Sequence, residues 1–253
     1  MKIDNKKRIQ ERKYEFPYHY IPRYKNGNFT QTRNLAWGYE YLSYMYFVLN
    51  ELKKINFVSL LDVGCGDGRF LFEAQKKFAN ARLVGIDIFK DAVNFANAFS
   101  NGPRYCVGNI TNKDLFKEKF DVITLIETLE HIPPQDIPDF LDGLSYYLKD
   151  SGYFLLTVPS NNVSKRARHY QHFDFKSLED TLDPYFHINN AYYLNKLSLQ
   201  DKIIRSLLSN KFFVLNNQYI LNKIYDYYSK HLVKAEKNNA RRIFVVCKKR
   251  ADQ

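Results

Sequence analysis

Acidic and imidazole side chains are concentrated in two short segments of this sequence. Glu127, Glu130 and His131 stand within five residues of one another, and His169 and His172 follow in a later segment. Carboxylates and imidazoles together suit a transition metal better than calcium. We therefore expect a divalent metal, either manganese, magnesium or iron, held by Glu127, Glu130, His131 and one or both of His169 and His172. A metal-free alternative makes His131, Glu127 and His169 the catalytic residues, with a histidine that accepts a proton at neutral pH.

These two segments follow apolar runs that are typical of buried strands. The first run is near Asp121–Ile126 and the second is near Tyr153–Val158. If both strands belong to one parallel sheet, their carboxyl ends lie at the same edge, where doubly wound folds bind their ligands. We therefore expect the acids and the histidines to meet at that edge.

A glycine-rich turn precedes them. The apolar run 58–63 leads into Gly64, Gly66 and Gly68, and a helix is expected to begin near Phe70. Glycines let the backbone pass close to a ligand, and the helix then presents unpaired N–H groups. A second apolar run ends at Asp87, about twenty residues further on, the spacing at which an acid binds ribose hydroxyls. Together they predict a nucleoside site in a doubly wound sheet.

The sequence Asp62-Val63-Gly64-Cys65-Gly66-Asp67-Gly68, with Gly85-Ile86-Asp87, closely resembles the class I S-adenosylmethionine (SAM) methyltransferases over residues 56–193. Nicotinamide enzymes, the alternative, space their glycines differently. The resemblance implies that the three glycines pass under the methionine part of SAM and that Asp87 holds the ribose. Asn109 stands where relatives often have an acid for adenine, and its amide oxygen can still accept a hydrogen bond. The cofactor residues implied are Asp62, Gly64, Gly66, Gly68, Asp87, Ile88, Asn109 and Ile110.

Apolar runs and helical patterns alternate along the core. Further strands are expected near 59–63, 82–87, 104–107, 188–193 and 242–247, and helices near 35–52, 70–78, 90–99 and 137–148. This alternation predicts an α/β fold with a doubly wound, mostly parallel seven-stranded sheet. About fifty residues separate the last two strands, too many for a hairpin loop, so we expect a helical insertion there.

The chain is therefore divided into four parts. Residues 1–56 form an aromatic and basic N-terminal segment with a helix that covers the site, and residues 57–195 form the SAM-binding core. Residues 196–240 form the helical insertion, and residues 241–253 form the last strand and a basic tail. The insertion could cap the site, pair two subunits, touch a membrane surface or pack on its own domain.

Two narrower resemblances suggest different acceptors. Glu127-x-x-Glu130-His131 matches the arrangement in the 2′-O-methyltransferases of small-RNA 3′ ends, in which these groups and a later histidine hold a metal. The chain departs from them after His172, where Phe-Asp-Phe replaces Phe-Glu-Trp. The segment 168–186 is more similar to bacterial methyltransferases that modify sugars, quinones and cell-surface polysaccharides, including those of capsule loci thought to methylate a phosphoramidate.

These resemblances indicate a SAM-dependent O-methyltransferase acting on a capsular or cell-surface polysaccharide or its precursor, with the phosphoramidate as one possible acceptor group. A metal-dependent RNA 2′-O-methyltransferase and a non-catalytic SAM-binding protein are the alternatives. Four residues are candidate substrate contacts: Tyr18, His19, Arg23 and Arg168. The aromatic segment around the first two could instead be a strap packed on the core.

Charge is unevenly distributed along the chain. Residues 1–56 carry 11 Lys and Arg against 5 Asp and Glu, residues 196–253 carry 13 against 4, and the middle carries 14 against 18. The basic ends favour an anionic partner, either an anionic glycan or a membrane surface, and no RNA-binding module is recognisable. A homodimer is a further possibility. Three scattered cysteines and a polar N-terminus without a signal-peptide pattern predict a cytoplasmic protein.

Overall fold

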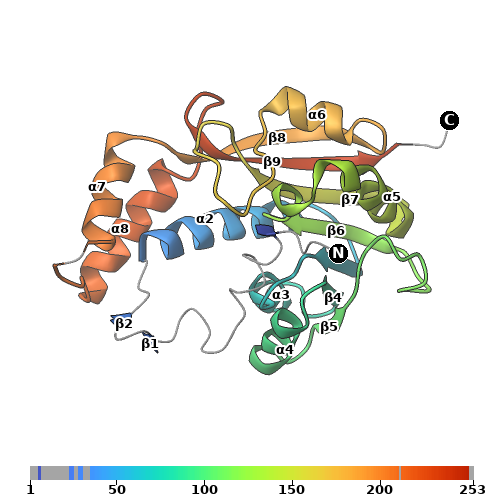
Figure 1. The fold of residues 1–253 in the computed structure, drawn as a ribbon, viewed down its shortest axis with the longest axis horizontal. Coiled ribbons are helices and arrows are strands. Elements are labelled where there is room, and N and C mark those ends of the chain that lie inside the picture. Colours follow the sequence, from blue (N-terminus) through green and yellow to red (C-terminus); the bar gives the residue numbers. More distant parts are fainter. Residues whose placement is uncertain (1–4, 7–22, 26–27, 31–34, 211, 251–253) are drawn as a thin grey trace.

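A seven-stranded sheet is the centre of the computed structural model, which describes residues 5–6, 23–25, 28–30, 35–210 and 212–250 (Figure 1). The strand order is β5-β4-β3-β6-β7-β9-β8. β9 is antiparallel to both of its neighbours, and the other pairs are parallel. The predicted doubly wound, mostly parallel sheet is thus confirmed. The strands are β3 (Ser59–Val63), β4 (Arg82–Asp87), β5 (Arg104–Val107), β6 (Phe120–Ile126), β7 (Leu148–Pro159), β8 (Phe186–Lys196) and β9 (Ala240–Lys249).

Helices cover both faces of this sheet (Figure 1). Alternate residues of one strand point to opposite faces, so Leu60 and Leu61 of β3 belong to two separate apolar clusters. One cluster includes residues of α2, α3 and α4, and the other includes residues of α5 and α6. The helices are α2 (Leu35–Leu52), α3 (Arg69–Gln75), α4 (Lys90–Phe99), α5 (Ile137–Tyr147) and α6 (Phe175–Leu182).

The segment between β8 and β9 contains two helices, α7 (Leu199–Leu208) and α8 (Gln218–His231), as the sequence predicted (Figure 1). The inner sides of α7 and α8 do not form a hydrophobic core separate from that of the main domain. Ile204, Leu208 and Tyr228 are buried in the same cluster as Val48 and Leu52 of α2. The insertion therefore packs on its own domain and contributes to the main core.

Short elements complete the structure. Two 3-10 helices, η2 (Leu129–His131) and η3 (Pro134–Asp136), follow β6, and β1 (Arg23–Lys25) pairs with β2 (Asn28–Thr30). The helix predicted over 70–78 begins one residue earlier and ends at Gln75. Within the described part of the chain, no helix is both long enough and apolar enough to cross a bilayer.

Candidate active site

A cavity of about 1140 Å³ opens at the carboxyl ends of β3, β4 and β6. Loops from both halves of the sheet form its walls, as the strand order requires. Gly68 is absent from these walls because it begins α3 beneath the turn. The other predicted cofactor residues all line the cavity: Asp62, Gly64, Gly66, Asp87, Ile88, Asn109 and Ile110.

The glycine turn leaves no room for side chains at two positions. Gly64 has a φ of 72°, and a Cβ there would lie 2.5 Å from the hydroxyl oxygen of Thr128. Gly68 has a φ of 78°, and a Cβ there would lie 2.8 Å from the ring of Tyr105. Both positions favour glycine, because the φ angle is positive and there is no room for a Cβ atom. The turn thus brings bare backbone to the floor of the cavity at Gly64, whereas Gly68 serves the packing of α3.

Asp87 is bound to this turn by its own carboxylate. Its Oδ2 accepts a hydrogen bond from the Gly66 N–H at 3.0 Å, and its Oδ1 accepts one from the Phe89 N–H at 2.9 Å. Burial raises the pKa of Asp87, and these N–H donors act in the opposite direction. The carboxylate is therefore held in a fixed orientation at the cavity wall, where each oxygen retains a lone pair for a ribose hydroxyl.

Asp62 and Asn109 occupy different environments. Asp62 accepts a hydrogen bond from the Thr124 hydroxyl at 2.7 Å, and burial raises its pKa to about 7. Asn109 is exposed, and its amide oxygen accepts a hydrogen bond from the Thr111 N–H at 3.2 Å. The oxygen that was expected to meet adenine is thus already engaged by the backbone, although it keeps a second lone pair.

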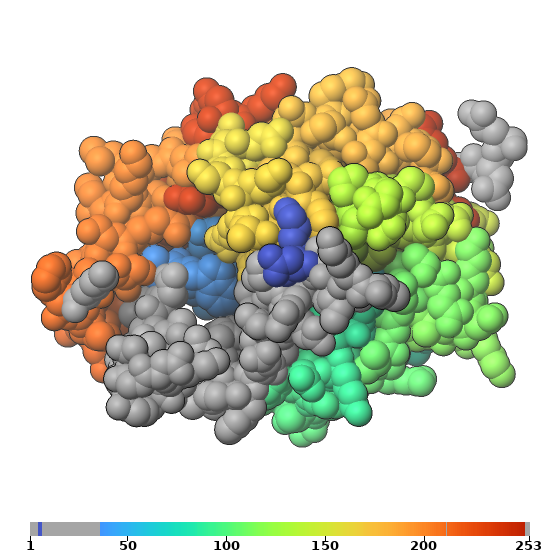
Figure 2. All heavy atoms as spheres, in the orientation of Figure 1, coloured from blue at the N-terminus to red at the C-terminus, as the bar shows by residue number. Residues whose placement is uncertain are grey.

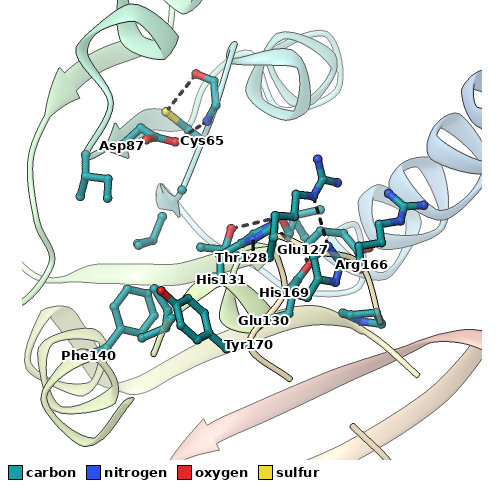
Figure 3. Close-up of a pocket in the computed structure, with 18 of the residues that line it drawn as sticks. Cys65, Asp87, Glu127, Thr128, Glu130, His131, Phe140, Arg166, His169 and Tyr170 are labelled. Atoms are coloured by element: carbon teal, nitrogen blue, oxygen red, sulfur yellow. Dashed lines mark hydrogen bonds and ion pairs between the residues drawn. The ribbon is translucent and has the colours of Figure 1, made fainter. Parts of the chain in front are cut away.

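Three of the predicted metal ligands come together on the opposite side of the cavity from Asp87 (Figure 3). One donor atom from each of Glu130, His131 and His169 lies within 4.8 Å of the others. Glu130 Oε1 is 3.8 Å from His131 Nε2. Glu130 is 1% exposed, and its other oxygen has no hydrogen-bond partner among the described residues. A buried carboxylate oxygen without a partner is costly, and a cation would satisfy it.

The tautomers of His131 and His169 are assigned by the hydrogen bonds that their Nδ1 atoms make. His131 Nδ1 lies 3.2 Å from the Arg168 carbonyl, so this nitrogen must donate and Nε2 keeps its lone pair. His172 Nδ1 likewise donates to the Val163 carbonyl at 3.0 Å, which leaves its Nε2 to accept from His169 Nδ1. His169 Nε2 therefore also keeps a lone pair, to which Arg168 Nε donates at 3.2 Å. Glu130 and His131 thus present an unpartnered carboxylate oxygen and an imidazole lone pair, whereas the His169 Nε2 lone pair would become available to a cation only if Arg168 Nε turned away from it.

The pKa values of Glu130, His131 and His169 are shifted in directions that bear on cation binding. Burial, with a further contribution from the charge of Glu127, raises the pKa of Glu130 well above its usual value. Burial also lowers the pKa of His131, and burial with the neighbouring His131 and Arg168 lowers the pKa of His169 to about 2. Neutral imidazoles are the form that binds metals, and a bound dication would favour ionised Glu130.

Glu127 and His172 do not join this group. Glu127 has a φ of 52°, which is unusual for a side-chain-bearing residue, and its Oε2 lies 3.0 Å from Arg242 Nε. Arg242 is 6% exposed and also bonds to Glu40 of α2. His172 lies behind His169. Of the five predicted metal ligands, three therefore have converging donor atoms, whereas Glu127 is ion-paired at the cavity wall and His172 contacts His169.

The predicted substrate contacts are only partly described. Tyr18 and His19 lie outside the described residues, as does the side chain of Arg23, which begins β1. Arg168 lines the cavity, and burial lowers the pKa of its guanidinium. Sequence reasoning missed the exposed Arg166, which also lines the cavity, as does the aromatic side of α2, the helix that was expected to cover the site. The basic run 165–168 beside the later histidines was the available signal.

Comparisons with known proteins agree with this geometry. A family model described as a methyltransferase domain matches residues 12–197. The ubiquinone biosynthesis O-methyltransferase of Glaesserella parasuis is 35% identical over 118 residues, which are 43% of this chain and 47% of that protein. The fatty-acid O-methyltransferase of Mycolicibacterium smegmatis is 29% identical over 100 residues, 39% of this chain and 36% of that protein. The chain spans about half the length, or less, of these curated relatives.

Solved structures share the fold. Magnesium protoporphyrin IX methyltransferase from Synechocystis, with bound SAM, matches with a TM-score of 0.57 at 14% identity, covering 99% of this chain and 100% of that one. A SAM-dependent methyltransferase from Archaeoglobus fulgidus matches with a TM-score of 0.54 at 16% identity, covering 81% of this chain and 94% of that one. At these identities the likeness concerns the fold alone.

The strand order, the glycine turn and the acid at the end of the next strand define a class I SAM-dependent methyltransferase fold. Because the family model matches most of the chain, this chain belongs to the methyltransferase domain family. The nicotinamide alternative is thereby excluded, and SAM is the cofactor of the fold. The acceptor is a separate question, which depends on the part of the cavity around Glu130 and His169.

Proposed function

We propose that this protein is a cytoplasmic, metal-assisted SAM-dependent O-methyltransferase whose acceptor is an anionic glycan, or a glycan precursor, of a capsule or cell surface. The observation that carries the proposal is the group formed by Glu130, His131 and His169 in the wall of the SAM cavity. Their donor atoms converge, and both histidines have the tautomer that leaves a lone pair on Nε2, which in His169 is shared with Arg168 Nε. In-line methyl transfer requires an oxygen held close to the sulfonium methyl, and such a group can hold one.

A metal bound there would acidify a hydroxyl or balance the charge of an anionic oxygen. The residues of the chain divide the remaining tasks. In the metal-free alternative, His131 Nε2 keeps the lone pair that can take the proton of a sugar hydroxyl, whereas a phosphoramidate oxygen is already anionic and needs only to be positioned. His172 and the carbonyls of Arg168 and Val163 hold the two rings in orientation.

The rest of the cavity supports an acceptor that is both anionic and ring-shaped. Arg166 and Arg168 line it beside the histidines, and guanidinium groups match phosphate and carboxylate geometry. Trp37 and Tyr41 line it from α2, with ring centroids 5.0 Å apart and ring planes 17° apart. Aromatic faces of this kind offer a flat apolar surface on which a sugar ring or another ring can lie.

The curated relatives support oxygen as the accepting atom, because those described above are O-methyltransferases by name. An RNA 2′-O-methyltransferase is the second candidate, since the Glu130–His131–His169 group is part of the ligand set that resemblance implied. Against it, Glu127 pairs with Arg242 and does not extend the group. A non-catalytic SAM-binding protein would have no use for converging donors at the methyl end of the cavity.

A transfer assay with labelled SAM separates these candidates. Chelator-treated protein would be incubated with capsule-type glycans, phosphoramidate-bearing glycans, ubiquinone-type phenolic precursors and short RNAs, with and without added manganese. We expect manganese-dependent label on a glycan. Label on RNA or on the phenol would replace the glycan proposal, and SAM binding without transfer to any acceptor would favour the non-catalytic alternative.

A further inference from the structure

The helical insertion exposes large apolar side chains on the side that faces away from the core. Phe212 is 94% exposed and Tyr219 is 71% exposed. The outer surface is defined by eight such residues on α7, on α8 and on the segment between them: Leu199, Ile203, Phe212, Phe213, Val214, Tyr219, Ile220 and Tyr227. Scattered exposed apolar residues are normal, but a contiguous group of this kind marks an interaction site.

The fold does not need these side chains. Ile204, Leu208 and Tyr228 already bury the inner sides of α7 and α8 against α2. The outer surface instead contains a groove of about 400 Å³, lined from α7 and α8 by residues that include Ile203 and Tyr219. The two helices stand at one end of the molecule, beyond the edge of α2 (Figure 1), and form a protruding lobe in the space-filling view (Figure 2).

Positive charge surrounds and enters the outer surface. Lys202, Lys223 and Lys230 are exposed. Lys223 Nζ lies 5.5 Å from the centre of the Tyr219 ring, and helical spacing places Lys230 on the same face. Asp226 is the one exposed acid of the two helices, because Asp201 is buried and pairs with Arg205 and Arg241. Apolar and aromatic side chains with lysines whose stems can lie along them are typical of helices that rest on an anionic membrane.

A second copy of this chain is a poorer match for the same surface. A two-fold contact would bring the same lysine-bearing surface of each copy together, and repulsion between two surfaces of like charge opposes association. An anionic lipid surface satisfies the lysines and the apolar side chains together. We propose that the outer surface of the helical insertion docks peripherally on the headgroup region of an anionic membrane.

Vesicle sedimentation tests this inference independently of the methyl acceptor. The full chain would be mixed with vesicles of phosphatidylcholine alone, and with vesicles that also contain phosphatidylglycerol, at low and high salt. We expect binding to the anionic vesicles that weakens as salt rises. Equal binding to both kinds of vesicle, or binding to neither, would overturn the proposal.

Variants of exposed residues locate the contact without disturbing the core. Phe212→Asp, and Lys223→Glu combined with Lys230→Glu, are each expected to weaken vesicle binding by about tenfold or more. The matched controls are Phe99→Asp on α4, where the side chain is 58% exposed, and Lys117→Glu, and both should bind as the parent does. Light scattering would accompany the assay. A parent dimer that Phe212→Asp converts to a monomer, without vesicle binding by either, would identify a second copy as the occupant instead.

Discussion

His169 Nδ1 lies 2.9 Å from Nε2 of His172, whose own Nδ1 donates to the Val163 carbonyl. His172 therefore contributes to the site through His169 and does not present a free nitrogen to it. The arrangement is that of an outer partner that fixes the tautomer and the orientation of a metal ligand. This contact lies within the loop after β7, and that loop is joined to η2 by the bonds from His131 Nδ1 to the Arg168 carbonyl and from the Tyr170 N–H to the Glu130 carbonyl.

Replacing His172 should weaken metal binding without removing it. Loss of an outer partner typically costs about 10- to 100-fold in metal affinity, so we expect a loss of that size in His172→Ala. Calorimetric titration with manganese measures it, and SAM titration of the same sample is the control because His172 lies away from Asp87. A complete loss of manganese binding would make His172 a direct ligand.

Asp87→Ala should weaken SAM binding by about 10- to 100-fold, because hydrogen bonds to a charged carboxylate contribute about 1.5 to 3 kcal/mol. The variant also leaves the N–H groups of Gly66 and Phe89 without their acceptor. Part of the loss of SAM affinity therefore comes from a change in the glycine turn. Asp87→Asn keeps one of the two acceptor oxygens, so it retains one of these N–H partners and removes the negative charge. Unchanged calorimetric affinity for SAM in Asp87→Ala would refute the assignment of the cofactor site.

Two glycines form a matched pair for the turn. Gly64→Ala adds a Cβ at 2.5 Å from the Thr128 hydroxyl and at a φ of 72°, so we expect destabilisation of about 2 kcal/mol or more and a fall of several degrees in Tm. Gly38 lies within α2 with nothing within 4 Å of such an atom. Gly38→Ala should therefore raise stability by up to about 1 kcal/mol. Equal Tm changes in the two variants would show that the turn is not strained in this way.

Much of the fold could be predicted from local patterns. The strands β3 and β4 have the bounds expected from their apolar runs, because short buried strands are nearly continuous in branched residues, and β5 at the edge of the sheet also has the expected bounds. The helix α6 was missed, although its capping box of Asp174 and Ser177 is visible in the sequence.

The composition of the site was less predictable. The convergence of Glu130, His131 and His169 followed from the sheet, since both loops end at one edge. Glu127 does not belong to this group because it forms an ion pair with Arg242. Arg242 is distant in the sequence and is buried in β9. No local pattern contains such a pair. Arg242 stands beside Arg241 at the start of the apolar run 243–247, and this position does not identify a partner.

Arg242 also explains an expected dependence of stability on pH. Burial alone would raise the pKa of Glu40, but Arg242 and Arg205 outweigh it and lower the pKa to about 2. A carboxylate with a lowered pKa adds stability above its unfolded-state pKa near 4.5, and this is lost as pH falls toward 2. The contribution at neutral pH is about 3 kcal/mol.

Glu40→Gln tests this relationship by denaturant unfolding at several pH values. At pH 7 the variant should be less stable than the parent by about 3 kcal/mol, because the buried Arg242 and the partly buried Arg205 each lose one of their charged partners. The difference should shrink below pH 4.5 as Glu40 becomes protonated in the parent. A difference that is constant over this range would mean that Glu40 is not held ionised by Arg242 and Arg205.

Manganese binding to chelator-treated protein is the most direct test of the proposed metal site. Titration calorimetry would compare the parent with Glu130→Gln, His169→Ala and Glu127→Gln, while SAM binding confirms that each variant is folded. We predict one manganese per parent chain, loss of binding in Glu130→Gln and His169→Ala, and binding retained in Glu127→Gln, because Glu127 is paired with Arg242. A parent that binds no divalent metal, or binding that survives in Glu130→Gln and His169→Ala, would contradict the account.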